Sequence, residues 1–158
     1  MNIFEIMHEP FRFTHRPIRL FEAFAGIGCQ RMALNRLQIP CESVGVSEID
    51  KYALASYKAI HGDCKNYGDI TKMETIPPCD IFTWSFHCTD LSKAGKQKGL
   101  NGTRSGLVYE VLRLLYATEN KPQVLIMENV VDVFAAILKN MIQPQPHAER
   151  YEVRECST

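Results

Sequence analysis

The sequence IRLFEAFAGIG at residues 18–28 decides the fold, because an apolar run passes directly into two closely spaced glycines. The apolar part is typical of a buried strand, and Gly26 and Gly28 allow a sharp turn before a helix. The helix is expected at residues 29–37, ending before a proline. Its apolar face is expected to consist of Met32, Ala33 and Leu37. The stretch therefore predicts a strand, a glycine loop and a helix in succession.

The same alternation continues along the chain. Further strands are expected at 43–48, 80–85 and 123–127, and further helices at 51–60, after Asp50 as N-cap, and at 105–118. Apolar strands that alternate with helices predict an α/β fold, a parallel sheet with helices on both faces. Binding sites of such sheets lie at the carboxyl ends of the strands.

Length and composition are those of an ordinary globular domain. The chain has 158 residues, 46% apolar and 23% charged, which excludes a disordered or coiled-coil chain. Eighteen Lys and Arg balance eighteen Asp and Glu, so any contact with nucleic acid must be local. No apolar run approaches the ~20 residues of a spanning helix, and we expect a soluble, intracellular protein. We expect an irregular segment at 1–17, a domain at 18–142 and a poorly ordered tail at 143–158.

Six cysteines are scattered without the spacing of a disulfide framework or a zinc site, so we expect free thiols and no metal. Cys88 stands apart because it follows the strand at 80–85 and opens a long polar loop, where a thiol is presented for chemistry. The alternative for a single cysteine is a small core residue. Glu128 ends another apolar strand, where burying a carboxylate is costly without a partner or a role.

Glu48 lies at the end of the second strand, 20 residues beyond Gly28. That arrangement is typical of a site for a ribose-bearing cofactor. Arg31 occupies the place of the third glycine of a dinucleotide fingerprint. The pattern alone therefore also fits a tight turn without a ligand and a solvated carboxylate.

Six elements, in the same order, resemble the DNA cytosine-5 methyltransferases. They are FAGIG at 24–28, SEID at 47–50, GDI at 68–70, SFHCTDLS at 85–92, GKQKG at 95–99 with RSGL at 104–107, and ENV at 128–130. The resemblance implies a Rossmann-like fold of the S-adenosylmethionine-dependent methyltransferases, incomplete on its C-terminal side. It also implies the substrate, a cytosine in DNA.

The resemblance assigns roles to individual residues. Cys88 would be the nucleophile that adds to carbon 6 of cytosine, and Glu128 the carboxyl group of raised pKa at ring N3. S-adenosylmethionine would be held by Phe24, Gly26, Gly28, Glu48, Ile49, Asp69, Ile70 and Leu107. DNA with the cytosine flipped out would be contacted by Ser92, Lys93, Lys96, Gln97, Lys98 and Arg104.

Two departures from the family pattern bear on activity. His87 precedes the cysteine where the family has proline, which fixes the backbone angle. After residue 130 the chain holds no Gln-x-Arg-x-Arg element. We therefore expect a partial catalytic domain that needs a missing half, for which a complementary chain is one source. The alternatives are a non-catalytic remnant that binds S-adenosylmethionine or a partner chain, and an RNA-directed relative. A nicotinamide-dependent oxidoreductase is disfavoured, because it leaves Cys88 and Glu128 without a role.

Overall fold

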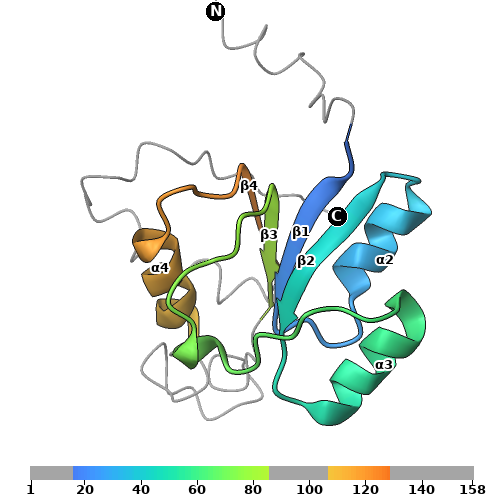
Figure 1. Cartoon of the computed structure of the whole chain (residues 1–158), viewed down its shortest axis with the longest axis horizontal. Helices are drawn as coiled ribbons and strands as arrows, with labels where there is room; N and C mark the ends of the chain where they lie inside the picture. The colour runs from blue at the N-terminus through green and yellow to red at the C-terminus, as the bar shows by residue number, and fades with distance from the viewer. Residues whose placement is uncertain (1–15, 86–106, 129–158) are drawn as a thin grey trace, which may run out of the picture. The chain divides into compact units, whose positions relative to one another are not determined.

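The computed structural model describes residues 16–85 and 107–128, and every structural statement below concerns those residues. They contain a four-stranded parallel sheet of order β2-β1-β3-β4 (Figure 1). The strands are β1 (Ile18–Ala23), β2 (Cys41–Ser47), β3 (Ile81–Trp84) and β4 (Val124–Met127). The order places the first strand of the chain in the interior of the sheet, and the chain crosses over from β2 to reach β3.

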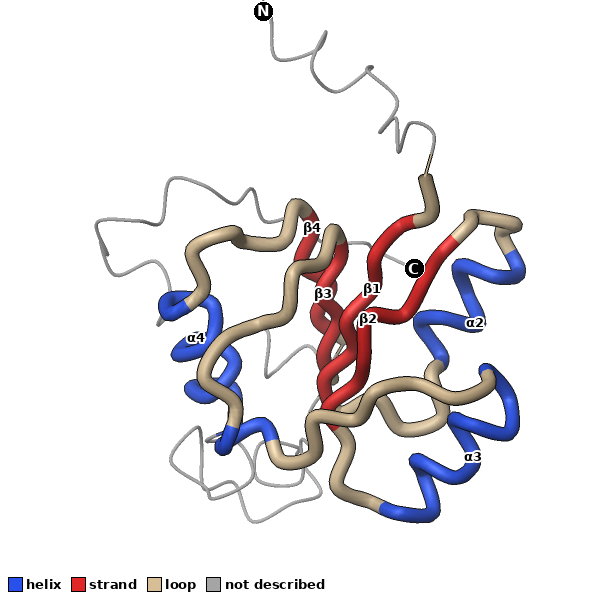
Figure 2. Tube along the Cα trace, in the orientation of Figure 1, coloured by secondary structure: helices blue, strands red, loops and turns tan. Residues whose placement is uncertain are grey.

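Helices lie on both faces of this sheet. Figure 2 shows α2 (Cys29–Arg36) and α3 (Lys51–His61) on one side and α4 (Leu107–Ala117) on the other. A short 3-10 turn, η1 (Ile70–Lys72), precedes β3. The predicted parallel sheet covered on both faces is confirmed. The predicted cap of α3 is also confirmed, because the Asp50 carboxylate accepts hydrogen bonds from the amides of Tyr52 and Ala53.

The register brings the strand ends level with one another. Ala23 at the end of β1 pairs with Ser47 of β2 on one side and with Trp84 of β3 on the other. Trp84 in turn pairs with Met127 at the end of β4. The segments that leave the four strands therefore start from a single edge, which we call the carboxyl edge.

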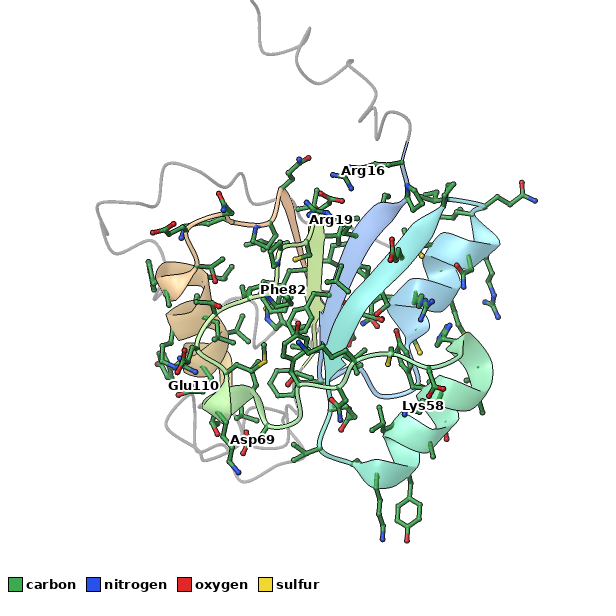
Figure 3. All side chains as sticks on the ribbon, in the orientation of Figure 1. Arg16, Arg19, Lys58, Asp69, Phe82 and Glu110 are labelled. Carbon is green, nitrogen blue, oxygen red and sulfur yellow. The ribbon has the colours of Figure 1, made fainter. Side chains whose placement is uncertain are left out.

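Each face of the sheet carries its own apolar core. On the side of α2 and α3, Ile18, Leu20 and Ile81 form a buried cluster against which Leu34 of α2 packs. On the other side the rings of Phe21 and Phe82 stack with centroids 5.4 Å apart, and Figure 3 shows Phe82 on the side of the sheet facing α4. Burying side chains of this size stabilises the fold by roughly 1.5–3 kcal/mol each.

The opposite end of the sheet, the amino edge, is closed by an ion-paired cluster. The Asp80 side chain is only 2% exposed. It accepts two hydrogen bonds from the Arg16 guanidinium, at 2.7 and 2.8 Å, and one from Arg19 Nη2 at 3.0 Å. The Arg19 backbone amide donates a further bond of 2.8 Å. The hydrogen bonds from Arg16 are the largest cause that holds the pKa of Asp80 well below its ordinary value.

Two sequence predictions are wrong in detail. The predicted apolar face of α2 is wrong at Ala33 and Leu37, which are both exposed. Leu37 is 69% exposed because α2 ends at Arg36 and a left-handed residue, Gln38, turns the chain back. Leu34 packs on the sheet in its place. The strand before Glu128 is half-buried and Glu128 itself is exposed, because β4 is the outer strand of the described sheet. The predicted irregular segment at 1–17, apart from residues 16 and 17, and the predicted tail at 143–158 lie outside the described residues, as does the predicted end of the domain at 142.

Candidate functional site

The loop between β1 and α2 has an unusual backbone. Phe24, Gly26 and Gly28 all adopt left-handed conformations, with φ of 54°, 56° and 78°. Such a conformation costs a residue with a side chain about 1–2 kcal/mol. Phe24 is nevertheless held in it, with its amide donating to Ser47 O at 2.8 Å. Backbone strain of this kind concentrates at ligand sites.

The two glycines of this loop have different surroundings. A Cβ placed on Gly26 would have no atom within 4 Å, so the backbone there faces open space. A Cβ on Gly28 would lie 2.5 Å from His61 Nε2 and 2.6 Å from a ring carbon of Tyr57. Gly26 is therefore the position that a ligand can approach, whereas Gly28 is required for packing against α3.

Glu48 connects the ends of two neighbouring strands. Its Oε2 accepts from the Gly26 amide at 2.9 Å, and its Oε1 accepts from the Asp50 amide at 2.8 Å. The Asn66 side chain bonds both the amide and the carbonyl of Glu48, at 3.1 and 2.9 Å. A carboxylate has about four acceptor positions. The Glu48 side chain is thus fixed in orientation and keeps acceptor capacity for a ligand.

The predicted GDI element lies beside the end of β2. Ser47 Oγ donates to Gly68 O at 2.7 Å. Asp69 Oδ1 accepts from the amide and hydroxyl of Thr71, and these bonds lower the pKa of Asp69. Figure 3 shows Asp69 at the end of the sheet away from Arg16. Ile70 is 3% exposed and belongs to the buried core.

The other predicted site residues differ in their exposure, and several lie outside the described residues. Ile49 is 79% exposed at the end of β2. Leu107 begins α4 and is half-buried, and Glu128 follows β4 with its amide donating to Trp84 O at 3.1 Å. Cys88 lies outside the described residues. So do the predicted DNA contacts, Ser92, Lys93, Lys96, Gln97, Lys98 and Arg104.

The carboxyl edge therefore combines three kinds of group. Glu48 and Asp69 offer carboxylate acceptors, Gly26 offers open backbone, and Phe24 and Ile49 offer apolar surface. This combination suits a ligand that has both hydroxyl groups and a flat apolar ring. Within the described part of the chain, no three His, Cys, Asp or Glu side chains are grouped closely enough to hold a metal ion. No helix there is long and apolar enough to cross a membrane.

A buried polar cluster beneath the glycine loop was not predicted. Glu22 of β1 is fully buried and accepts a 2.5 Å hydrogen bond from the Tyr57 hydroxyl, which in turn accepts from Arg31 Nη1 at 3.3 Å. Burial raises the pKa of Glu22, and the bond from Tyr57 partly opposes it. The available signal was the single acidic residue in the apolar strand before the glycines.

The described cysteines differ in their suitability as nucleophiles. Burial raises the pKa of Cys79 to about 12 and also raises the pKa values of Cys41 and Cys64. A raised pKa lowers the thiolate fraction at neutral pH. Cys29 is exposed at the start of α2.

The chain matches a protein family over most of its length. Residues 18–144 correspond to the family described as C-5 cytosine-specific DNA methylase. That range begins at the first residue of β1 and extends beyond β4.

Similar curated proteins are bacterial methyltransferases. Type II methyltransferase M2.ScrFI of Lactococcus lactis subsp. cremoris is 34% identical over 171 residues, covering 72% of this chain and 47% of the relative. Type II methyltransferase M.NlaX of Neisseria lactamica is 40% identical over 114 residues, covering 71% and 36%. Type II methyltransferase M.HhaI of Haemophilus parahaemolyticus is 40% identical over 115 residues, covering 72% and 34%. The chain therefore spans about half or less of the length of these relatives.

Solved structures share the fold. The Dnmt2 methyltransferase of S. pombe superimposes with a TM-score of 0.63 at 26% identity, covering 78% of this chain and 41% of that one. The methyltransferase EhMeth of Entamoeba histolytica gives a TM-score of 0.64 at 19% identity, covering 80% and 45%, and this likeness concerns the fold alone.

Proposed function

Because the chain belongs to the C-5 cytosine-specific DNA methylase family, we propose that it forms part of an enzyme that methylates carbon 5 of cytosine in DNA. The observation that carries the proposal is the convergence of the motifs at one edge of the sheet. The glycine loop and Glu48 leave neighbouring strands there. The strands that precede Cys88 and Glu128 end at the same edge, because Trp84 pairs with Ala23 and with Met127.

We propose S-adenosylmethionine as the methyl donor, and the described residues fit its chemistry. Glu48 would accept hydrogen bonds from the two ribose hydroxyls, since its carboxylate is already oriented by two backbone amides. Phe24 and Ile49 would contact the faces of the adenine, with Asp69 at its edge. Gly26 would let the backbone approach the donor closely, because no atom stands within 4 Å of its missing Cβ. When bound, this cofactor supplies an electrophilic methyl group on a sulfonium sulfur.

The proposed chemistry on the base depends on Cys88 and Glu128. Carbon 5 of cytosine is a poor nucleophile, so the Cys88 thiolate would add to carbon 6 and make carbon 5 enamine-like. Glu128 would share or donate a proton at ring N3 and thereby favour the addition. Carbon 5 would take the methyl group and then lose its own proton to a base as the bond to Cys88 Sγ breaks. These steps return the thiolate and leave 5-methylcytosine.

The proposed substrate is DNA with the target cytosine out of the helix, because its carbon 6 is hidden in a duplex. Three lysines and an arginine among the residues that we propose for DNA contact supply local positive charge to a chain of balanced total charge. They are Ser92, Lys93, Lys96, Gln97, Lys98 and Arg104. The printed names of the type II relatives favour DNA over RNA as substrate.

We further propose that the reaction needs groups beyond these 158 residues. The curated relatives are about twice as long or longer, and no Gln-x-Arg-x-Arg element follows residue 130. Such groups would come from a longer protein or from a complementary chain. A non-catalytic chain that binds S-adenosylmethionine or a partner is the second candidate, favoured by His87 in place of proline.

Calorimetry with S-adenosylmethionine tests the cofactor site. The chain is expected to bind it, and Glu48→Ala is expected to weaken binding by about 1–3 kcal/mol. Glu42→Ala is the matched control, because Glu42 is exposed near the start of β2, at the amino edge. Equal binding by wild type and Glu48→Ala would remove Glu48 from the site, and no binding by wild type would contradict the proposed cofactor.

Trapping on duplex DNA that contains 5-fluorocytosine tests the catalytic role. A covalent adduct is expected only when the missing region of a relative is supplied, and Cys88→Ser should abolish it. Cys29→Ser, with an exposed thiol elsewhere, should leave the adduct intact. His87→Pro should raise the yield, because 1 Å of misplacement can cost about a hundredfold in rate. A chain that binds cofactor but never forms the adduct would support the non-catalytic candidate, and adducts with tRNA alone would indicate an RNA-directed enzyme.

A further inference from the structure

The glycine loop is held from the side of α3 by two residues that carry no proposed role in cofactor binding. Nε2 of His61, the last residue of α3, lies 3.2 Å from Ile27 O and 3.2 Å from Gly28 O. A carbonyl oxygen only accepts, so His61 Nε2 carries the hydrogen and shares it between the two carbonyls. The end of α3 is therefore bonded directly to the loop.

Tyr57 supports the same contact one turn earlier in α3. Its ring centroid lies 4.7 Å from that of His61, and both rings are the nearest neighbours of the missing Cβ of Gly28. The Tyr57 side chain is fully buried, and its hydroxyl donates to Glu22. Glu22 lies in β1, two residues before the left-handed Phe24. Tyr57 thus connects α3 to the strand from which the loop leaves.

The glycine loop is therefore hydrogen-bonded from two sides. From the β2 side the Glu48 carboxylate binds the Gly26 amide. From the α3 side His61 binds the Ile27 and Gly28 carbonyls. The side of Gly26 on which a Cβ would stand remains open, with no atom within 4 Å of that position. A loop fixed before binding does not lose conformational entropy on binding, which raises affinity.

We infer that His61 and Tyr57 are positioning residues that hold the glycine loop in the shape required to bind the cofactor. The inference rests on the proposed function, because it concerns the same S-adenosylmethionine site. Neither residue touches the cofactor in this proposal. They act through the backbone carbonyls and the packing of Gly28.

His61→Leu and His61→Gln separate the hydrogen bond from simple packing. Leucine fills space without a donor, whereas glutamine retains an N–H group that can reach the same carbonyls. In calorimetry with S-adenosylmethionine, His61→Leu is expected to weaken binding about tenfold, the size of one lost hydrogen bond. His61→Gln is expected to restore most of the affinity. Ala59→Leu, an exposed position on the same turn of α3, is the matched control and should bind as wild type does.

Hydrogen exchange of backbone amides in the chain without cofactor provides an independent readout. The Gly26 amide bonds Glu48 and the Gly28 amide bonds Ala25 O. Their exchange is expected to rise about tenfold in His61→Leu, while the amides of Phe21 and Phe82 in the sheet stay protected. If His61→Leu does not fold, Tyr57→Phe replaces it, because phenylalanine keeps the ring and removes only the hydroxyl that bonds Glu22. It is expected to raise loop exchange and weaken binding several-fold.

The two readouts distinguish the possible failures. A wild-type chain that binds no S-adenosylmethionine contradicts the proposed function, whatever the exchange data show. If wild type binds and a folded His61→Leu binds equally well, the positioning role is overturned, even where loop exchange has risen. Equal loss of affinity in His61→Leu and His61→Gln would also overturn it, because the donor would then be irrelevant.

Discussion

The amino edge and the carboxyl edge of the sheet both contain carboxylates, but these carboxylates have different partners. At the amino edge, Asp80 is buried and receives its hydrogen bonds from Arg16 and Arg19, whose charges compensate its own. At the carboxyl edge, the Glu48 carboxylate accepts hydrogen bonds from two backbone amides of the described chain, Gly26 and Asp50, beside a strained and partly open loop. The first carboxylate is neutralised by the protein, and the second retains the capacity to bind a ligand. One sheet thus has an end closed by ion pairs and an end with open backbone, where we propose that the cofactor binds.

The figures make this difference visible in space. Figure 3 shows Arg16 and Arg19 at one end of the strands and Asp69 at the other. We therefore expect changes at the amino edge to alter stability without affecting binding, and changes at the carboxyl edge to do the reverse.

The largest expected effect is at the amino edge. Asp80→Ala removes the acceptor of the Arg16 and Arg19 bonds and should lower the free energy of unfolding by about 2–4 kcal/mol, measured by urea denaturation. Asp63→Ala is the matched control. Its side chain is 91% exposed and pairs with Lys58 at 3.1 Å, and exposed pairs contribute little.

The pH dependence of Asp80 sharpens the same comparison. Its pKa is lowered from 3.8 in the folded chain, chiefly by Arg16. A lowered pKa contributes stability that is present above the unfolded value and is lost as the pH falls through the folded value. Wild type should lose this contribution in acid and Asp80→Asn should not. The separation of the edges would be broken if Asp80→Ala weakened S-adenosylmethionine binding in chains that are still folded.

A medium effect is expected within the carboxyl edge, where the two glycines should behave differently. Gly28→Ala forces a Cβ to within 2.6 Å of Tyr57 and His61 and keeps φ at 78°. We expect it to lower the melting temperature, with a free-energy loss of about 2–3 kcal/mol. Gly26→Ala meets no atom within 4 Å, so only the backbone term of about 1–2 kcal/mol remains. For each kcal/mol of stability that is lost, Gly26→Ala should weaken cofactor binding more than Gly28→Ala does. Equal melting temperatures for the two variants would contradict the packing role of Gly28.

The sequence predicts the strands and helices of this molecule better than it predicts the contacts between distant residues. Alternating apolar runs and the Asp50 cap are local signals, and the strands and helices they predict were found close to their expected bounds. The amino-edge cluster joins residues 61 and 64 positions apart. No local pattern marks such a pair, because distant contacts depend on how the strands are ordered. The packing of Gly28 against α3 has no local signal for the same reason, since the side chains it contacts are about 30 residues later.

The smallest expected effect concerns Glu22, which is buried like Asp80 but lacks the arginine side chains that compensate Asp80. It is buried as Asp80 is, but among the described residues no arginine side chain forms a hydrogen bond to it, and its Oε1 has no side-chain partner there. The backbone and the charge of Arg31 oppose the effect of burial only in part. Its pKa is raised above 4.5, chiefly by burial. A raised carboxyl pKa means that the folded state holds its proton more tightly. Stability is then full below the unfolded value and declines as the pH rises through the folded value.

Glu22→Gln removes this titration and keeps an oxygen acceptor for the Tyr57 hydroxyl. Melting temperatures measured from pH 4 to pH 8 should therefore shift progressively in favour of Glu22→Gln relative to wild type, whatever their order at pH 4. Glu42→Gln, the same change at an exposed position of β2, should show no such trend. A difference between Glu22→Gln and wild type that stays constant with pH would show that Glu22 is as well compensated as Asp80.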